Sequence, residues 1–153
     1  MKLIRKKAAQ WHIDPNNVGV VGFSAGGHLA SVIATKSNVE ARPNFQILFY
    51  PVITMIPGYT HQGSHDNFLG SSARKKDERD YSTDMQVNRN TPRGLILLSD
   101  DDSSVAPANG VNYYNELYRH DVPASLFVFP DGGHGWGMRP RFKYQPEMLL
   151  LIK

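Results

Sequence analysis

The stretch GFSAGGH, residues Gly22–His28, joins a run of apolar residues to a helical pattern. The apolar run covers residues 18–21, and the helical pattern covers residues 29–36. A serine in G-x-S-x-G, on a sharp turn between a strand and a helix, has its hydroxyl held above the edge of a sheet. The pattern makes Ser24 a candidate nucleophile, although an ordinary strand-to-helix connection can carry the same letters.

Three glycines around this serine have a steric role in the prediction. We expect Gly22 and Gly26 to leave room for a tight turn that side chains would block. We also expect Gly26 and Gly27 to let the following helix lie close against the sheet.

Two further reactive side chains follow apolar runs later in the chain. The run GLILL (94–98) leads through a serine into Asp100–Asp102, and the run SLFVF (125–129) leads to His134. The carboxyl ends of parallel strands meet at one edge of a sheet, so we expect these groups to converge on Ser24. A hydroxyl, an imidazole and a carboxylate together are the groups that nucleophilic catalysis by serine requires.

Strand and helix patterns alternate along the whole chain, without a linker or an internal repeat. Strands are expected at 18–23, 45–50, 94–98 and 125–129, and helices at 3–11, 29–36 and 109–120. In the last of these helices, Val111, Tyr114 and Tyr118 share one side. The alternation predicts an α/β fold with about four parallel strands joined by right-handed crossovers.

Composition indicates one globular domain. The 153 residues are 41% hydrophobic and 10% aromatic, with no cysteine and a formal charge of +3. The absence of cysteine excludes disulfides and thiolate metal sites but indicates no compartment. No apolar run approaches the length of a membrane span, and we expect neither membrane nor nucleic acid as a partner. The basic residues form three groups that we interpret as solvated surface: Arg5 to Lys7, Arg74 to Lys76, and Arg139, Arg141 and Lys143.

Three strings in the chain resemble those of a known family. They are GFSAGGHLA (22–30), LLSDDDSSVAPANG (97–110) and FPDGGHGWGM (129–138). They are similar to sequences of the α/β-hydrolase acetylesterases and carbohydrate esterases, a group that includes acetylxylan-esterase-like and feruloyl-esterase-like proteins. The resemblance covers nearly the whole chain and implies an α/β-hydrolase fold.

The resemblance also implies roles for particular residues. Ser24 would be the nucleophile, His134 the general base and then acid, and Asp102 the carboxylate that orients the histidine. In the family the acid precedes a Val-Pro pair by three residues. Here Val105 is followed by alanine before the proline, so Asp101 remains an alternative.

The family pattern is interrupted before the serine. Family domains begin with several strands and a His-Gly-Gly-Gly-type loop that supplies an oxyanion-hole amide, and no such string precedes Ser24 here. We therefore expect residues 1–153 to form a single, truncated α/β-hydrolase domain. The amide of Ala25 would supply one oxyanion donor, and a second must come from elsewhere. The strand at 18–23 would be a bare sheet edge, through which we expect self-association.

Residues 54–90 are the least regular part of the chain, and we expect a cap-like insertion there with a short helix over 72–79. Charged residues at helix spacing are Arg74 with Glu78 and Lys76 with Asp80. His61, His65 and Asp66 have the composition of a metal site. However, no predicted helix holds them and no H-E-x-x-H glutamate accompanies them, so we interpret them as a polar loop.

The function that these residues favour is hydrolysis of a carboxylic ester through an acyl-enzyme, and the resemblance implies a small acyl group, such as acetyl on a carbohydrate. This reaction requires neither metal nor cofactor.

Two further residues lie near these motifs. Trp136 either lines the acyl or sugar pocket or packs against the final helix, and His28 is expected to be structural. One alternative is a prolyl-oligopeptidase-type peptidase, which normally carries an aromatic residue after the serine, where this chain has Ala25. The other is a non-catalytic half-domain: a fragment, a pseudoenzyme or an assembly module.

Overall fold

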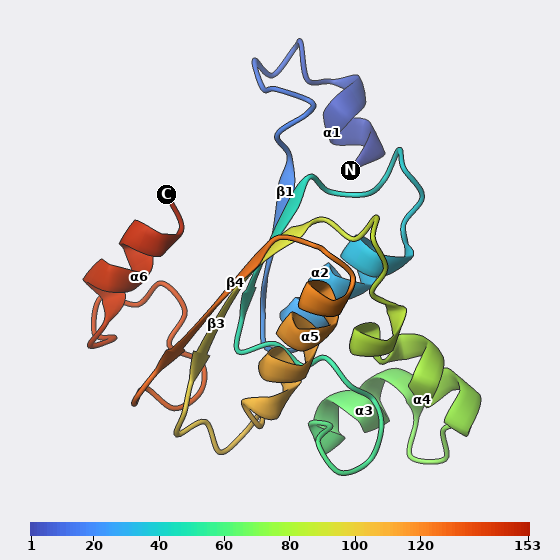
Figure 1. The fold of residues 1–153 in the computed structure, drawn as a ribbon, viewed down its shortest axis with the longest axis vertical. Coiled ribbons are helices and arrows are strands. Elements are labelled where there is room, and N and C mark those ends of the chain that lie inside the picture. The colour runs from blue at the N-terminus through green and yellow to red at the C-terminus, as the bar shows by residue number, and fades with distance from the viewer.

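The computed structural model describes residues 1–153, and at its centre lies one sheet of four parallel strands in the order β1-β2-β3-β4 (Figure 1). The strands are β1 (Gly19–Phe23), β2 (Phe45–Phe49), β3 (Arg93–Ser99) and β4 (Ala124–Phe129). The predicted α/β class and the four parallel strands are confirmed. Each connection between neighbouring strands carries at least one helix, as parallel pairing requires.

Helices cover both faces of the sheet (Figure 1). They are α1 (Lys2–Lys6), α2 (Ala25–Lys36), α3 (Gln62–Leu69), α4 (Lys75–Tyr81), α5 (Ala108–Arg119) and α6 (Gln145–Leu151), with a short 3₁₀ turn, η1 (Thr83–Gln86). Helices α2 and α5 lie on one face, α6 lies on the other, and α3 and α4 lie beyond the carboxyl ends of the strands. None of these helices has the length and apolar character needed to cross a membrane.

The core has a large cluster on each face of the sheet and a third, smaller one formed by Val52, Met55 and Val105. Leu48 and Ile96 point toward α2 and α5, while their neighbours Phe49 and Leu97 point toward α6, and all four are fully buried. This alternation follows from the two-residue period of a strand. Strands β2 and β3 are therefore covered on both faces and are mostly apolar, with Gln46 as a buried polar residue in β2.

The parallel hydrogen-bond ladder continues one residue beyond three of the strands. Ser24 N–H donates to Phe49 O (3.0 Å), Tyr50 N–H to Leu97 O (2.7 Å) and Asp100 N–H to Phe129 O (2.8 Å). These bonds place the residues that follow β1, β2 and β3 at one level along the edge of the sheet. We call this edge, formed by Ser24, Tyr50 and Asp100, the sheet rim.

The segment 54–90 contains more helix than the sequence predicted. The short helix expected over 72–79 is α4, and the unpredicted α3 begins after His61, whose Nδ1 accepts a hydrogen bond from Ser64 N–H (3.2 Å). An imidazole nitrogen thus takes the place of the usual oxygen cap. The expectation of a polar loop around His61 and His65 was wrong in this respect.

Of the three residues expected on one side of α5, Val111 and Tyr114 pack against the core. Gly110, Tyr113 and Leu117 face the sheet, whereas Tyr118 is 74% exposed. The reason is close packing, because a Cβ on Gly110 would lie 2.7 Å from a methyl group of Leu98. A count of apolar residues alone does not register such a contact.

The sheet has two open edges, because β1 pairs only with β2 and β4 pairs only with β3. At the β1 edge, Val21 and Phe23 are 51% and 37% exposed. An open strand edge with apolar side chains is a template for pairing with another chain.

From this edge we predict self-association. Purified protein should scatter light as a dimer or larger species at micromolar concentration. Val21→Lys should shift it toward monomer, because a charged side chain on an edge strand disfavours edge-to-edge pairing. A strict monomer at all concentrations would contradict the prediction.

Candidate active site

Three side chains from separate loops meet at the sheet rim. His134 Nε2 lies 2.8 Å from Ser24 Oγ, and His134 Nδ1 lies 2.7 Å from Asp102 Oδ2. Asp102 is almost fully buried, with 1% of its side chain exposed, and the His134 side chain is 21% exposed. The structure therefore places the predicted hydroxyl, imidazole and carboxylate in one hydrogen-bonded line.

The two neighbouring aspartates have different partners. Asp102 Oδ1 accepts hydrogen bonds from the backbone N–H groups of Ser104 (2.9 Å) and Val105 (3.0 Å), which leaves Oδ2 for His134. Asp101 instead accepts a bond from Gly133 N–H (2.7 Å). The geometry thus places Asp102 against the imidazole, while Asp101 holds the loop that carries it.

The turn at Ser24 is strained. Ser24 has φ 54° and ψ −122°, a region that L-residues rarely adopt. Such a conformation costs about 1–3 kcal/mol and persists only where the surroundings enforce it. Here Ser24 N–H bonds to the end of β2, and Ser24 C=O accepts bonds from Gly27 N–H (2.9 Å) and Val52 N–H (3.1 Å).

At two of the three glycines of the turn there is no room for a side chain. A Cβ on Gly22 would collide with the carbonyl oxygen of Gly26, and a Cβ on Gly27 would lie 2.6 Å from Pro51 Cβ. A Cβ on Gly26 would meet nothing within 4 Å. The expectation that Gly26 makes room for the turn was wrong, because its missing side chain would point into open space.

The backbone amide of Ala25 is positioned as the sequence predicted for an oxyanion donor. It is the first residue of α2, directly after Ser24, and its N–H donates to no backbone carbonyl. The first N–H groups of a helix have no partner within the helix and carry partial positive charge. The amide is therefore free to bind a developing negative oxygen beside Ser24.

Tyr50 is a rim residue that the sequence analysis did not select. It has φ 36°, and its ring lies edge-on to the His134 imidazole, 4.6 Å between centroids. Burial raises the pKa of its phenol. The sequence feature that could have pointed to Tyr50 is a tyrosine followed by proline directly after a buried strand. This feature does not predict the positive φ of Tyr50. The contact restricts rotation of the imidazole.

Trp136 packs into the core. It is 5% exposed, and its indole stacks on Phe142 at 4.1 Å and meets Phe129 edge-on at 5.8 Å. Most of the Trp136 surface is therefore in packing contacts, as in the second of the two roles considered from the sequence. One part of the residue also lines a hollow next to His134.

The imidazole of His28 forms no hydrogen bond with Ser24, although the backbone N–H of His28 donates to Ser24 O (3.3 Å). Its Nε2 lies 2.8 Å from Tyr81 O, and its ring meets Phe68 edge-on at 5.5 Å. Burial lowers the pKa of His28, so the neutral ring donates its N–H to that carbonyl. The imidazole links α2 to the end of α4, which agrees with the structural role expected for it.

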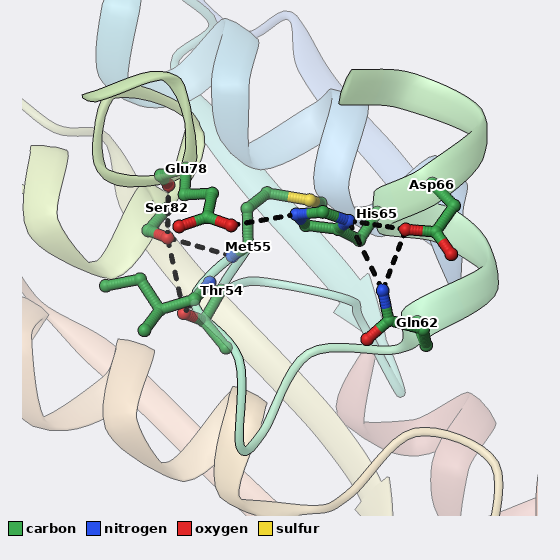
Figure 2. A network of polar contacts seen from close by, with 8 residues as sticks. Thr54, Met55, Gln62, His65, Asp66, Glu78 and Ser82 are labelled. Carbon is green, nitrogen blue, oxygen red and sulfur yellow. Dashed lines mark hydrogen bonds and ion pairs between the residues drawn. The ribbon is translucent and has the colours of Figure 1, made fainter. Parts of the chain in front are cut away.

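His65 is the centre of a polar network that joins α3 to α4, as Figure 2 shows. Its Nδ1 lies 2.8 Å from Asp66 Oδ1, and its Nε2 lies 3.3 Å from Glu78 Oε1. Glu78 was expected to pair with Arg74, which instead pairs with Asp77 (2.6 Å). The hydrogen bond with Asp66 raises the pKa of His65, because both ring nitrogens can donate only in the cation.

Two hollows border the three converging side chains on different sides. One, of about 320 Å³, is lined by His134 and the loop after it, and it is mostly polar. The other, of about 380 Å³, is lined by Ala25 and by apolar residues that include Leu29, Met55 and Phe68. No group of three or more histidine, aspartate or glutamate side chains is arranged to hold a metal ion.

Known proteins match this chain along nearly its whole length. A family model described as the prolyl oligopeptidase family matches residues 1–150. An acetylxylan esterase from Xylanibacter ruminicola is 44% identical over 152 residues, which is 97% of this chain and 32% of the relative. An endo-1,4-beta-xylanase B from Butyrivibrio fibrisolvens is 33% identical over 146 residues, 88% of this chain and 23% of the relative.

A solved structure gives the same fold. The crystal structure of an acetyl ester-xyloside bifunctional hydrolase from Caldicellulosiruptor lactoaceticus superposes with a TM-score of 0.92 at 34% identity, over 99% of this chain and 60% of that chain. The chain thus spans less than two thirds of each of these proteins.

The fold and the strained turn between β1 and α2 define the class of protein as an α/β hydrolase, here in the partial form that the sequence predicted. The resemblance to acetylesterases of this class is confirmed by the match to the acetylxylan esterase. Within the class, the chain belongs to the prolyl oligopeptidase family.

The glycine geometry predicts a graded stability series. Gly22→Ala should lower the free energy of unfolding by about 1–3 kcal/mol, because overpacking displaces the turn. The matched control Gly26→Ala should leave it unchanged or raise it by about 0.4–1 kcal/mol, since alanine favours the helix. Urea unfolding measures both, and equal losses in the two variants would contradict the steric analysis.

The His65 network predicts a pH-dependent contribution to stability. The folded pKa of His65 is raised above the ordinary 6.5, so its contribution is complete below pH 6.5 and is lost as pH rises through the folded pKa. The difference in unfolding free energy between the wild type and His65→Gln should therefore be largest at acidic pH. Urea unfolding between pH 5.5 and 8.5 tests this, and a difference independent of pH would refute it.

Proposed function

We propose that this protein is a serine carboxylic-ester hydrolase that removes small acyl groups, acetyl above all, from a carbohydrate or similar alcohol. The observation that carries the proposal is the hydrogen-bonded line from Ser24 Oγ through His134 to Asp102. The 44% identity to an acetylxylan esterase supports the choice of an acetyl ester.

The first half of the proposed reaction makes an acyl-enzyme. His134 Nε2 accepts the proton of Ser24 Oγ as the oxygen attacks the ester carbonyl, and Asp102 stabilises the resulting imidazolium. Ala25 N–H donates to the carbonyl oxygen as it becomes negative. His134 then gives the proton to the leaving alcohol, and the C–O bond to that alcohol breaks.

The second half returns the enzyme to its starting state. His134 takes a proton from a water molecule that attacks the acyl carbonyl on Ser24, and the acid product leaves as the proton returns to Ser24 Oγ. Every proton in this scheme passes through His134, which agrees with its position between Ser24 and Asp102.

A peptidase is the second candidate, because the family model takes its description from prolyl oligopeptidase. The same three side chains serve amide hydrolysis on this fold. Ala25 after the serine favours the esterase, since those peptidases normally have an aromatic residue there. Comparison of acetyl esters with proline-containing peptide substrates separates the two activities.

Substitution of the three side chains tests the proposal. Ser24→Ala should remove turnover of p-nitrophenyl acetate above the uncatalysed rate. Asp102→Asn should lower kcat/KM by about 10³- to 10⁴-fold, because the histidine then takes the wrong tautomer.

Asp101→Asn is the matched control for Asp102→Asn. The same change at the neighbouring position weakens only a loop contact and should lower kcat/KM by less than about tenfold. Equal rates for wild type and Ser24→Ala would refute the esterase and leave the non-catalytic half-domain. Equal losses at the two aspartates would refute the role assigned to Asp102.

A further inference from the structure

The polar hollow beside His134 has an unusual excess of positive charge. Its lining includes Arg139, Arg141 and Lys143, with Asp131 as the only carboxylate. Lys143 Nζ lies 2.9 Å from Asp131 Oδ2, so these two charges offset each other. No ion pair joins Arg139 or Arg141 to a carboxylate of this chain, and two guanidinium groups remain without an anionic partner.

The hollow lies on the side of the site where the alcohol of an ester belongs. In the proposed reaction His134 delivers a proton to the leaving alcohol, so that portion of the substrate lies next to the imidazole. The polar hollow is lined by His134 and by neither Ser24 nor Ala25. The apolar hollow, in contrast, is lined by Ala25, next to the expected position of the acyl oxygen.

Arg139 is also tied to the rim through Tyr50. Burial raises the pKa of the Tyr50 phenol, and the positive charge of Arg139 acts in the opposite direction. The Tyr50 ring lies 4.6 Å from the imidazole of His134, and His134 and Arg139 line the same hollow.

On the basis of the proposed esterase function, we propose that the alcohol portion of the substrate carries a carboxylate, which Arg139 and Arg141 bind. The guanidinium fork matches a carboxylate in two parallel hydrogen bonds, and arginine keeps its charge at every relevant pH. The stacked rings of Trp136 and Phe142 are buried beneath the same hollow and support its wall. An acetylated sugar that bears a uronic acid has this chemistry.

A matched pair of aryl acetates tests the charge preference. 4-Acetoxybenzoate and 4-acetoxybenzamide differ in one substituent of similar size, so the ratio of their kcat/KM values reports the charge. In the double variant Arg139→Gln/Arg141→Gln this ratio should fall about fivefold relative to the wild type, the order expected for two exposed ion pairs. Added salt should lower the wild-type ratio as well, because it screens exposed charges.

Two controls make the result specific. Lys6→Gln/Arg89→Gln removes the same net charge from surface positions outside the hollow and should leave the ratio at the wild-type value. Arg141→Gln alone should lower the ratio by an intermediate amount. This single variant replaces the double variant in the test if the double variant does not fold. An unchanged ratio in the arginine variants, or an equal fall in the control, overturns the proposal.

A binding measurement separates this proposal from the esterase. Glucuronate should perturb the tryptophan fluorescence of the protein, to which Trp136 contributes, at lower concentration than glucose, and the difference should disappear in Arg139→Gln/Arg141→Gln. The proposal is overturned if glucuronate and glucose bind alike. Failure of the esterase itself has a different signature, which is the absence of Ser24-dependent turnover of p-nitrophenyl acetate.

Discussion

The hydrogen bonds that extend the parallel ladder past the strand ends are the constraint on which the site depends. Ser24 is bonded to the end of β2, Tyr50 to the end of β3 and Asp100 to the end of β4. Backbone groups of the sheet, rather than side-chain contacts, therefore fix the starting points of the loops. Short loops are therefore enough to bring the Ser24 hydroxyl and the Asp102 carboxylate to the His134 imidazole. Ser24 and His134 meet in this way although they are 110 residues apart in the chain.

The same rim holds two residues in conformations that an isolated chain would avoid. Ser24 and Tyr50 both have positive φ without being glycine. Strain of this kind requires rigid surroundings, and the buried strands β2 and β3 supply them through covered faces and complete ladders. Gly22 and Gly27 also help to hold the turn at Ser24, because their lack of a side chain lets the turn pack closely against α2 and Pro51. The rigid sheet thus fixes the position of Ser24, the proposed nucleophile.

What the sequence could predict, and what it could not, follows from the range of the interactions involved. The turn at Ser24 and the alternation of strands depend on neighbouring residues, so the fold and the convergence of three loops were accessible from sequence patterns. Asp101 and Asp102 are adjacent, and only the direction of each side chain distinguishes them. Glu78 bonds to a histidine 13 residues away on another helix, a contact that charge spacing within one helix does not reveal.

The order of the three groups along the chain has a consequence for biosynthesis. Ser24 is translated first, and the imidazole that lies against it follows 110 residues later. At a translation rate of about 5–20 residues per second, the serine exists for about 5–20 s without its base. A serine hydroxyl alone is a weak nucleophile, so the proposed reaction cannot begin on the ribosome until the last strand and the loop beyond it have been made.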